Sequence, residues 1–218
     1  MNAINSNFDL NRLILQGESK PQYVEEMWQL SPDWMNFKYE RVPTAVYQQE
    51  VVYGLIRDLA KPDGRLLAVG SHSDPCAYAL KNSGWHIDLV DPADNGIDLA
   101  TAWQDETHYP RGKYDVVFSN SVMEHVPDDL EFIQQICQYL APGGYAFLTV
   151  DYKEGWRAGD PKPAPDCRLY SAESLAYVFS TIPSGFTLLG QPRYFLSSPH
   201  FTFDSVTYGF ALISFQRD

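Results

Sequence analysis

The chain has 218 residues, a length typical of one α/β domain, and 44% of them are hydrophobic and 20% charged. Its net charge is −12, with 28 acidic residues against 16 lysines and arginines. Phosphate groups are bound by basic side chains, so this balance argues against nucleic-acid and anionic-membrane partners. Cys76, Cys137 and Cys167 are far apart and lack zinc-site spacing, so we predict neither a metal nor a disulfide.

The sequence also bears on the cellular compartment. No apolar run approaches the roughly 20 residues that cross a bilayer, and the first residues lack the basic and apolar regions of a secretory signal. We therefore expect a cytoplasmic protein. Nothing in the sequence indicates an oligomeric state.

The first part of the chain differs from the rest, although we expect one domain over residues 1–218. Residues 1–42 are polar and aromatic with interspersed prolines, which predicts a helical, aromatic cap on an α/β core of residues 43–218. The core begins with an amphipathic helix over residues 43–59, which ends at the turn Lys61-Pro-Asp-Gly64.

Strands and helices then alternate. Short apolar runs predict strands over residues 65–70, 86–91, 97–99, 114–119 and 145–150. Helical spacing predicts helices over residues 75–81 and 130–140, the second ending at Pro142-Gly-Gly144. Such alternation indicates a parallel sheet with right-handed crossovers.

The last third departs from this pattern. After a loop rich in proline and glycine, residues 171–179 predict a capped helix, and strands follow near residues 186–189 and 208–215. The last two strands are joined without a helix, so they should pair antiparallel. The expected fold is a Rossmann-like three-layer α/β sandwich, with a mostly parallel seven-stranded sheet and an antiparallel last strand.

The ends of the first two strands indicate a ligand site. In an open α/β sheet, ligands bind beyond the carboxyl ends of the strands. The first strand ends at Gly70 and the second at Asp91, whose carboxylate is suited to accept both hydroxyls of a ribose. The alternative is that Asp91 only caps its strand and faces water.

Four segments resemble the successive motifs of class I S-adenosylmethionine-dependent methyltransferases, closest to the branch that modifies small molecules and sugars. They are residues 65–70, 89–91, 114–125 and 140–149. The specific part is the segment ending in Glu124-His125, followed by Pro-Gly-Gly. The resemblance implies S-adenosylmethionine as the cofactor and a small-molecule acceptor.

The glycine loop departs from the family pattern. Ala68 stands where the family has an acid, and the usual G-x-G-x-G is replaced by Gly70-Ser-His72-Ser-Asp74. Either the loop follows another path, with Asp74 near the cofactor's ammonium, or binding is weakened. A catalytically inactive binding or assembly protein is therefore one alternative. A nicotinamide-dependent oxidoreductase is another, although it would need G-x-G-x-x-G at Gly70.

The resemblance also assigns cofactor contacts by position. Gly70, Ser71 and His72 would surround the methionine part, and Asp91 would bind the ribose. Pro92, Asp98 and Leu99 would contact the adenine, and Ser119 and Asn120 would lie beside the sulfonium.

Methyl transfer also requires an aligned acceptor and, for a hydroxyl, removal of its proton. His125 is the first candidate base because imidazole titrates near neutrality, although it could merely orient a helix. Asp151 and His200 are rivals. Aromatic side chains near residues 194–203, with Trp28, Trp34, Tyr39 and Trp156, could line an acceptor pocket. We therefore expect the hydroxyl of a sugar or another small metabolite as the acceptor.

Overall fold

The computed structural model describes residues 9–15, 17–32, 46–164, 167–194, 201–203 and 205–218. Within these residues the strands form one seven-stranded sheet in the order β2-β1-β3-β4-β7-β5, and β6 pairs with β7 beside that path. The strands are β1 (Arg65–Val69), β2 (His86–Val90), β3 (Tyr114–Asn120), β4 (Leu140–Tyr152), β5 (Phe186–Leu188), β6 (Phe201–Phe203) and β7 (Val206–Arg217).

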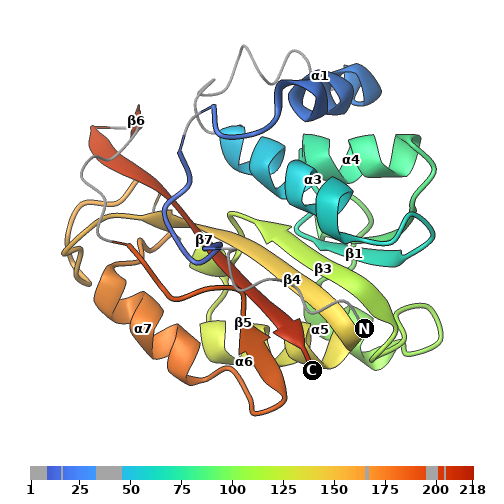
Figure 1. Ribbon diagram of the computed structural model, residues 1–218. Helices are drawn as coiled ribbons and strands as arrows, with labels where there is room; N and C mark the ends of the chain where they lie inside the picture. The colour runs from blue at the N-terminus through green and yellow to red at the C-terminus, as the bar shows by residue number, and fades with distance from the viewer. Residues whose placement is uncertain (1–8, 16, 33–45, 165–166, 195–200, 204) are drawn as a thin grey trace.

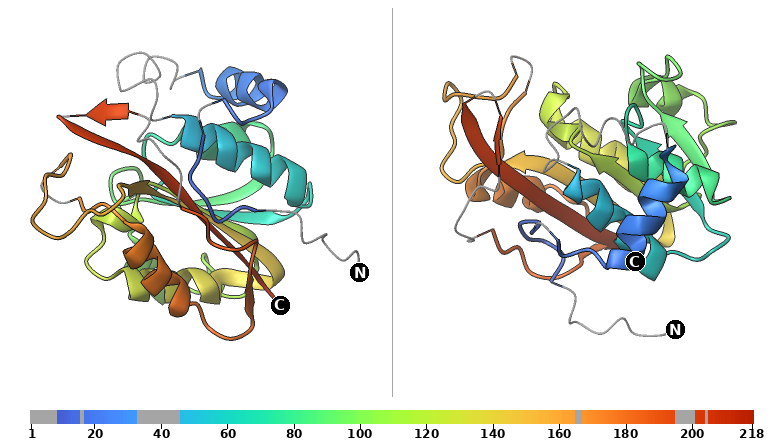
Figure 2. Two further views of the ribbon diagram at one scale, coloured as in Figure 1. Left: turned by 60° about the vertical axis from the view of Figure 1, so that its left-hand side comes forward. Right: turned by 90° about the horizontal axis from the view of Figure 1, so that it is seen from above.

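Helices cover both faces of the sheet, as Figure 1 shows. One face carries α1 (Pro21–Leu30), α3 (Tyr47–Leu59) and α4 (Pro75–Asn82). The other carries α5 (Leu99–Gln104), α6 (Asp129–Tyr139) and α7 (Ala172–Ser180), and the short 3-10 helix η2 (Met123–His125) follows β3. Figure 2 shows the same layers from two further directions.

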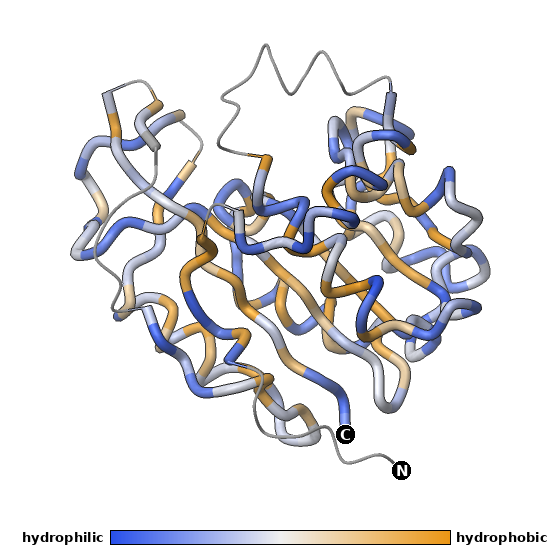
Figure 3. The backbone as a smooth tube through the Cα atoms, turned by 45° about the horizontal axis from the view of Figure 1, so that its top comes forward, coloured by the Kyte–Doolittle hydropathy of each residue, from blue (hydrophilic) through white to orange (hydrophobic). Residues whose placement is uncertain are grey.

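The alternation of strand side chains produces the two cores. On β1, Leu66 and Ala68 pack toward α3 and α4, whereas Leu67 and Val69 pack toward α5 and α6. All four are almost completely buried. In Figure 3 hydrophobic stretches of the chain run through the sheet, and hydrophilic stretches gather in the outer turns. Strands covered on both faces are apolar throughout, which is why the sequence predicts them so clearly.

The strand directions confirm the predicted mixed sheet. β1, β2, β3 and β4 are parallel, whereas β7 runs antiparallel to β4, β5 and β6. The predicted helix at Ser171 is also confirmed, because Ser171 and Ser174 form a reciprocal capping box.

Two local predictions were wrong. The strand expected over residues 97–99 is absent, because the Asp98 side chain accepts a hydrogen bond from Thr101 N and caps α5 instead. The strand expected over residues 145–150 begins earlier, because β4 starts at Leu140 and includes Pro142-Gly-Gly144, although α6 ends before these residues as predicted. Tyr114 pairs with Leu140 but Val116 pairs with Tyr145, so the extra residues form a bulge. A Cβ on Gly144 would lie 2.7 Å from Tyr114 O, which explains the glycine there.

The N-terminal segment has two separate roles. Residues 10–14 run beside β7, where Ile14 N donates to Phe210 O and Leu212 N donates to Arg12 O (Figure 1). This segment, the N-terminal strap, fills the edge of β7 between β6 and β5. The helix α1 packs on α3 and α4 and contributes no residue to the pocket described below. Within the described residues, no helix has the length and apolar character needed to span a bilayer.

Candidate functional site

A pocket of about 620 Å³ opens beyond the carboxyl ends of β1, β2 and β3, where the topology of an α/β sheet places ligand sites. This volume lies in the range of small-molecule and cofactor sites. The lining combines a few polar groups with apolar walls: Val69, Gly70, His72, Val90, Asp91, Pro92, Ala93, Asp98, Leu99, Asn120, Ser121, Val122, His125, Val126 and Phe132.

Asp91 is the best-placed acid in this pocket. One carboxylate oxygen accepts from His72 N at 3.0 Å and the other from Ala93 N at 2.7 Å, and the residue is 9% exposed. A carboxylate has about four lone-pair positions, so each oxygen keeps room for one further donor. Two hydroxyls of a ribose fit that remaining capacity, and the backbone N–H groups fix the carboxylate in place for them.

The atypical glycine loop is held by Asp94. Its carboxylate accepts from Ser71 Oγ at 3.2 Å and Tyr78 OH at 2.9 Å, and it contacts His72 Nδ1 at 2.9 Å. Burial acts to raise the pKa of Asp94, but these hydrogen bonds, led by that from His72, outweigh it and lower the pKa below its usual value. Ser71 is fully buried and does not line the pocket, so it fixes the loop instead of facing a ligand.

Asp74, at the end of the same loop, is also turned inward. Its side chain caps α4 by accepting from Cys76 N at 2.9 Å, and its second oxygen accepts from Asn120 Nδ2 at 3.0 Å. Burial raises the pKa of Asp74 to about 6, with the Asn120 hydrogen bond opposing it. Asp74 therefore ties the loop to the end of β3, and it is absent from the pocket lining.

The structure brings together most of the predicted site residues. The pocket is lined by Gly70, His72, Asp91, Pro92, Asp98, Leu99, Asn120 and His125. Ser119 is buried behind it, and its hydroxyl has no hydrogen-bond partner among the described residues. Asp151 lies deeper, at the end of β4, and His200 is outside the described residues.

Two buried carboxyl groups lie next to this pocket. Glu124 is 1% exposed and Asp151 7% exposed, and each influences the ionisation of the other. Burial raises the pKa of Asp151 to about 7, with the nearby side chains of Glu124, Ser121 and Cys167 opposing this rise. Burial and the charge of Asp151 hold the pKa of Glu124 well above its ordinary value.

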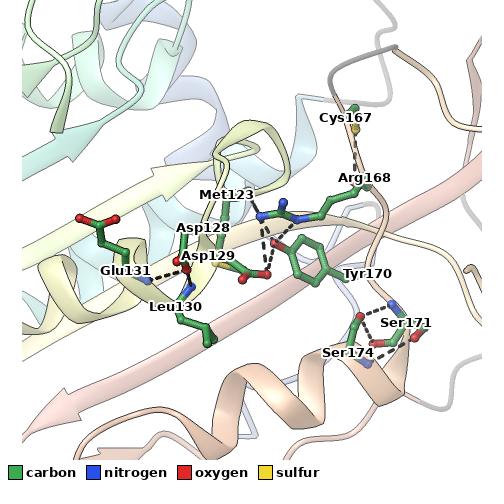
Figure 4. Close-up of polar contacts among 10 residues, drawn as sticks. All are labelled: Met123, Asp128, Asp129, Leu130, Glu131, Cys167, Arg168, Tyr170, Ser171 and Ser174. Carbon is green, nitrogen blue, oxygen red and sulfur yellow. Dashed lines mark hydrogen bonds and ion pairs between the residues drawn. The ribbon is translucent and has the colours of Figure 1, made fainter. Parts of the chain in front are cut away.

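A clamp around Arg168 holds the turn that carries Glu124 (Figure 4). Arg168 Nη2 donates to Met123 O at 3.0 Å, and Arg168 Nε donates to Tyr170 OH at 3.1 Å. The Tyr170 hydroxyl in turn contacts Met123 O at 3.3 Å and Asp129 Oδ2 at 3.1 Å. Arg168 N also donates to Glu124 O at 3.1 Å, so the loop before α7 fixes η2 from both backbone and side chain.

Besides Ser121, which lines the pocket, the sequence interpretation missed Gln48. It is 3% exposed in the first turn of α3, and its amide contacts Ser121 Oγ at 2.8 Å and Thr149 Oγ1 at 2.5 Å. Thr149 Oγ1 also lies 3.2 Å from Asn120 Oδ1, which extends this set of hydrogen bonds to the end of β3. The available signal was a glutamine at helical spacing from Val51 and Val52, on the apolar side of its helix.

The aromatic residues expected at an acceptor pocket are dispersed. Tyr194 belongs to the core, where it stacks on Tyr152 and Phe179 and donates to Leu212 O. Trp28 is buried in α1 and donates to Glu50. Trp156 donates to Pro161 O, in the loop that follows β4. Trp34, Tyr39 and Phe195 lie outside the described residues.

Comparisons with known proteins agree with this geometry. Residues 46–188 match a family described as "Methyltransferase domain". The ubiquinone biosynthesis O-methyltransferase of Leptothrix cholodnii is 22% identical over 76% of this chain and 73% of its own length. The mitochondrial ubiquinone biosynthesis O-methyltransferase of Homo sapiens is 33% identical over 42% of this chain, which spans only 25% of the human protein.

A solved structure supports the fold alone. The 1,6-didemethyltoxoflavin-N1-methyltransferase of Burkholderia thailandensis superposes with a TM-score of 0.53 over 94% of this chain and 93% of that chain, at 14% identity. The family match covers well over half of the chain and includes β1, β2, β3, β4 and the pocket that they form. The chain therefore belongs to the methyltransferase domain family, within the class I, S-adenosylmethionine-dependent methyltransferases.

Proposed function

We propose that this protein transfers a methyl group from S-adenosylmethionine to a hydroxyl of a small molecule. The observation that carries the proposal is Asp91, an acid at the end of β2 that is fixed by two backbone N–H groups and keeps acceptor capacity toward the pocket. The names of the two sequence relatives, both O-methyltransferases, favour oxygen as the methylated atom.

The chain's own residues divide into binding and proton-handling groups. Asp91 would hold the ribose, Asp98 and Leu99 would meet the adenine, and Gly70 lets the backbone pass close to the methionine part. When bound, S-adenosylmethionine supplies an electrophilic methyl group on a positively charged sulfur. His125 lies exposed at the pocket and is one candidate base; Asp151, reached through Ser121, is the other.

Calorimetric titration tests the cofactor assignment. We expect S-adenosylmethionine and S-adenosylhomocysteine to bind at micromolar concentration, and NAD to give no heat. Asp91→Asn should weaken both by ten- to a hundredfold, because hydrogen bonds to a charged group contribute about 1.5–3 kcal/mol each. Asp63→Asn, in the exposed turn before β1, is the matched control and should bind like the wild type. Absence of binding by the folded wild type would instead support the inactive-protein alternative, and NAD binding the oxidoreductase.

The acceptor class is tested separately. The purified protein with methyl-labelled S-adenosylmethionine would be offered a phenol, a catechol, a methyl glycoside and a primary amine. We expect label on a hydroxyl compound and none on the amine. Transfer to the amine alone would contradict O-methylation while leaving the cofactor assignment intact.

A further inference from the structure

The buried carboxyl pair is unusual for its surroundings. Among the described residues, neither carboxyl oxygen of Glu124 has a hydrogen-bond partner of ordinary geometry, although Ser121 and the backbone of Asp151 lie close enough to affect its ionisation. Burying a polar group without partners is costly, so such a group calls for an explanation. Asp151 lies beside it, and the charge of Asp151 raises the pKa of Glu124 further.

Ser121 connects this pair with the pocket. The residue lines the pocket, and its hydroxyl lies 3.5 Å from Asp151 Oδ1. Gln48 contacts the same hydroxyl through both amide atoms: Gln48 Nε2 donates to Ser121 Oγ at 2.8 Å, and Gln48 Oε1 lies 3.0 Å from it as an alternative acceptor of the Ser121 proton. One lone pair of Ser121 Oγ remains for a donor in the pocket. Ser121 has a φ of +52°, a conformation that a residue with a side chain adopts at a cost. Hydrogen bonds from Ser121 N to Thr149 hold it there.

We propose that Ser121, Asp151 and Glu124 form a proton relay that carries the proton of an acceptor hydroxyl from the pocket into the buried carboxyl pair. The inference rests on the proposed function. As the acceptor oxygen bonds to the methyl carbon, the electron pair of the broken carbon–sulfur bond stays on sulfur. The acceptor proton passes to Ser121 Oγ, and the hydroxyl proton of Ser121 passes to the Asp151 carboxylate.

Glu124 is the positioning residue of this relay. Burial and the charge of Asp151 hold the pKa of Glu124 well above the ordinary value, and the Glu124 side chain opposes the burial that raises the pKa of Asp151 to about 7. The two carboxyl groups therefore titrate as a pair, and the pKa of Asp151 lies near neutrality. A base that titrates near the working pH is the most effective proton acceptor. The Arg168 clamp holds the Glu124 backbone, while the guanidinium itself bonds to Met123 O and Tyr170.

The groups that face the pair come from several elements. Tyr47 from α3, Tyr208 from β7, and Cys167 and Arg168 from the loop before α7 all interact electrostatically with Asp151 or Glu124. Burial raises the pKa values of Tyr47 and Tyr208, with the charge of Asp151 contributing to both and that of Glu18 to Tyr47, so both phenols stay neutral at neutral pH. Tyr170, from the same loop as Arg168, also faces Glu124, and burial raises its pKa, so this phenol stays neutral as well.

The test is a ¹³C NMR titration of the full chain, labelled at the Asp and Glu carboxyl carbons, from pH 5 to 9 with and without S-adenosylhomocysteine. We expect one carboxyl to titrate near neutrality and one to stay protonated above it. Glu124→Gln should remove the upper step, and Asp151→Asn should lower the remaining Glu124 midpoint. Ser121→Ala should raise the Asp151 midpoint, because the lost hydrogen bond favours the ionised form.

Two controls make the result specific. Ser119→Ala removes a buried hydroxyl from β3, two residues before Ser121, and should leave both midpoints unchanged. Glu173, exposed on α7, is the internal reference carboxyl. The relay is overturned if Glu124 and Asp151 titrate like Glu173, or if Ser121→Ala moves neither midpoint. Failure of S-adenosylhomocysteine to bind would count against the proposed function instead, since the titration of the free protein tests the relay without it.

Discussion

Val122 closes directly over Gly70. A Cβ built on Gly70 would lie 2.1 Å from Val122 Cγ2, and Gly70 has a φ of +78°. Both residues line the pocket. Two features therefore require a glycine directly after β1: the left-handed backbone conformation of Gly70, and the side chain of Val122 in the turn after β3, which leaves no room for a Cβ.

Gly70→Ala should destabilise the protein by about 3 kcal/mol, the sum of about 1 kcal/mol for the left-handed conformation and about 2 kcal/mol for overpacking. Gly84→Ala is the matched control, since Gly84 has a φ of +88° but nothing within 4 Å of a Cβ. This variant should lose only the stability due to the left-handed conformation, about 1 kcal/mol. Urea unfolding measures both. The double variant Gly70→Ala with Val122→Ala should recover part of the loss, and strict additivity of the two changes would refute the contact.

Much of this fold is predictable from the sequence because its signals are local. The apolar run of β1 and the capping serine of α7 each determine their own element. The prediction of a strand over residues 97–99 failed because an aspartate is found both next to strands and at helix N-caps, and a segment of three residues is too short to distinguish a strand from the start of a helix. The position of Asp91 in the pocket followed from the general topology of α/β sheets, which requires no knowledge of individual contacts.

The missed parts of the site depend on contacts between distant segments. Gln48 meets Thr149 across a separation of 101 residues, and Glu124 meets Asp151 between two different elements. No spacing rule along the chain reports such pairs. The inward turn of Asp74 is similar, since its partner Asn120 lies 46 residues away.

The N-terminal strap should contribute more to stability than its length suggests. The Asn11 side chain donates to Ser214 O at 3.0 Å and Gly190 O at 3.1 Å and accepts from Ser214 N at 2.7 Å, with the residue fully buried. Asn11→Ala leaves these backbone groups unsatisfied, so we expect a loss of about 3 kcal/mol. Asn82→Ala removes one exposed hydrogen bond, to Leu30 O, and should cost under about 1 kcal/mol. Equal losses in thermal unfolding would contradict this role of the strap.

The buried carboxyl groups predict how stability depends on pH. The pKa of Asp151 is raised from 3.8 to about 7, so the folded state binds more protons than the unfolded state between these values. The stability associated with the neutral carboxyl is complete below about pH 4 and is lost as pH rises through about 7. The free energy of unfolding should therefore fall between pH 5 and pH 8. Asp151→Asn should reduce that fall, leaving the parts due to Glu124 and Asp74, and Glu173→Gln should not change it. An identical pH dependence in Asp151→Asn and the wild type would refute the raised pKa.

The Arg168 clamp makes a prediction about local dynamics. Arg168 donates to Met123 O in η2 and forms an ion pair with Asp129 at the start of α6 at 3.6 Å, and its bond to Tyr170 OH fixes the guanidinium within the loop before α7 (Figure 4). Arg168→Ala should increase amide hydrogen exchange at residues 123–126 while leaving the sheet protected, because local opening depends on the contacts of each segment. Arg157→Ala, which removes an exposed arginine from the loop after β4, should leave exchange at those residues unchanged. If both variants exchange alike, the backbone bond from Arg168 N to Glu124 O holds the turn alone, and the side-chain clamp has no part in positioning Glu124.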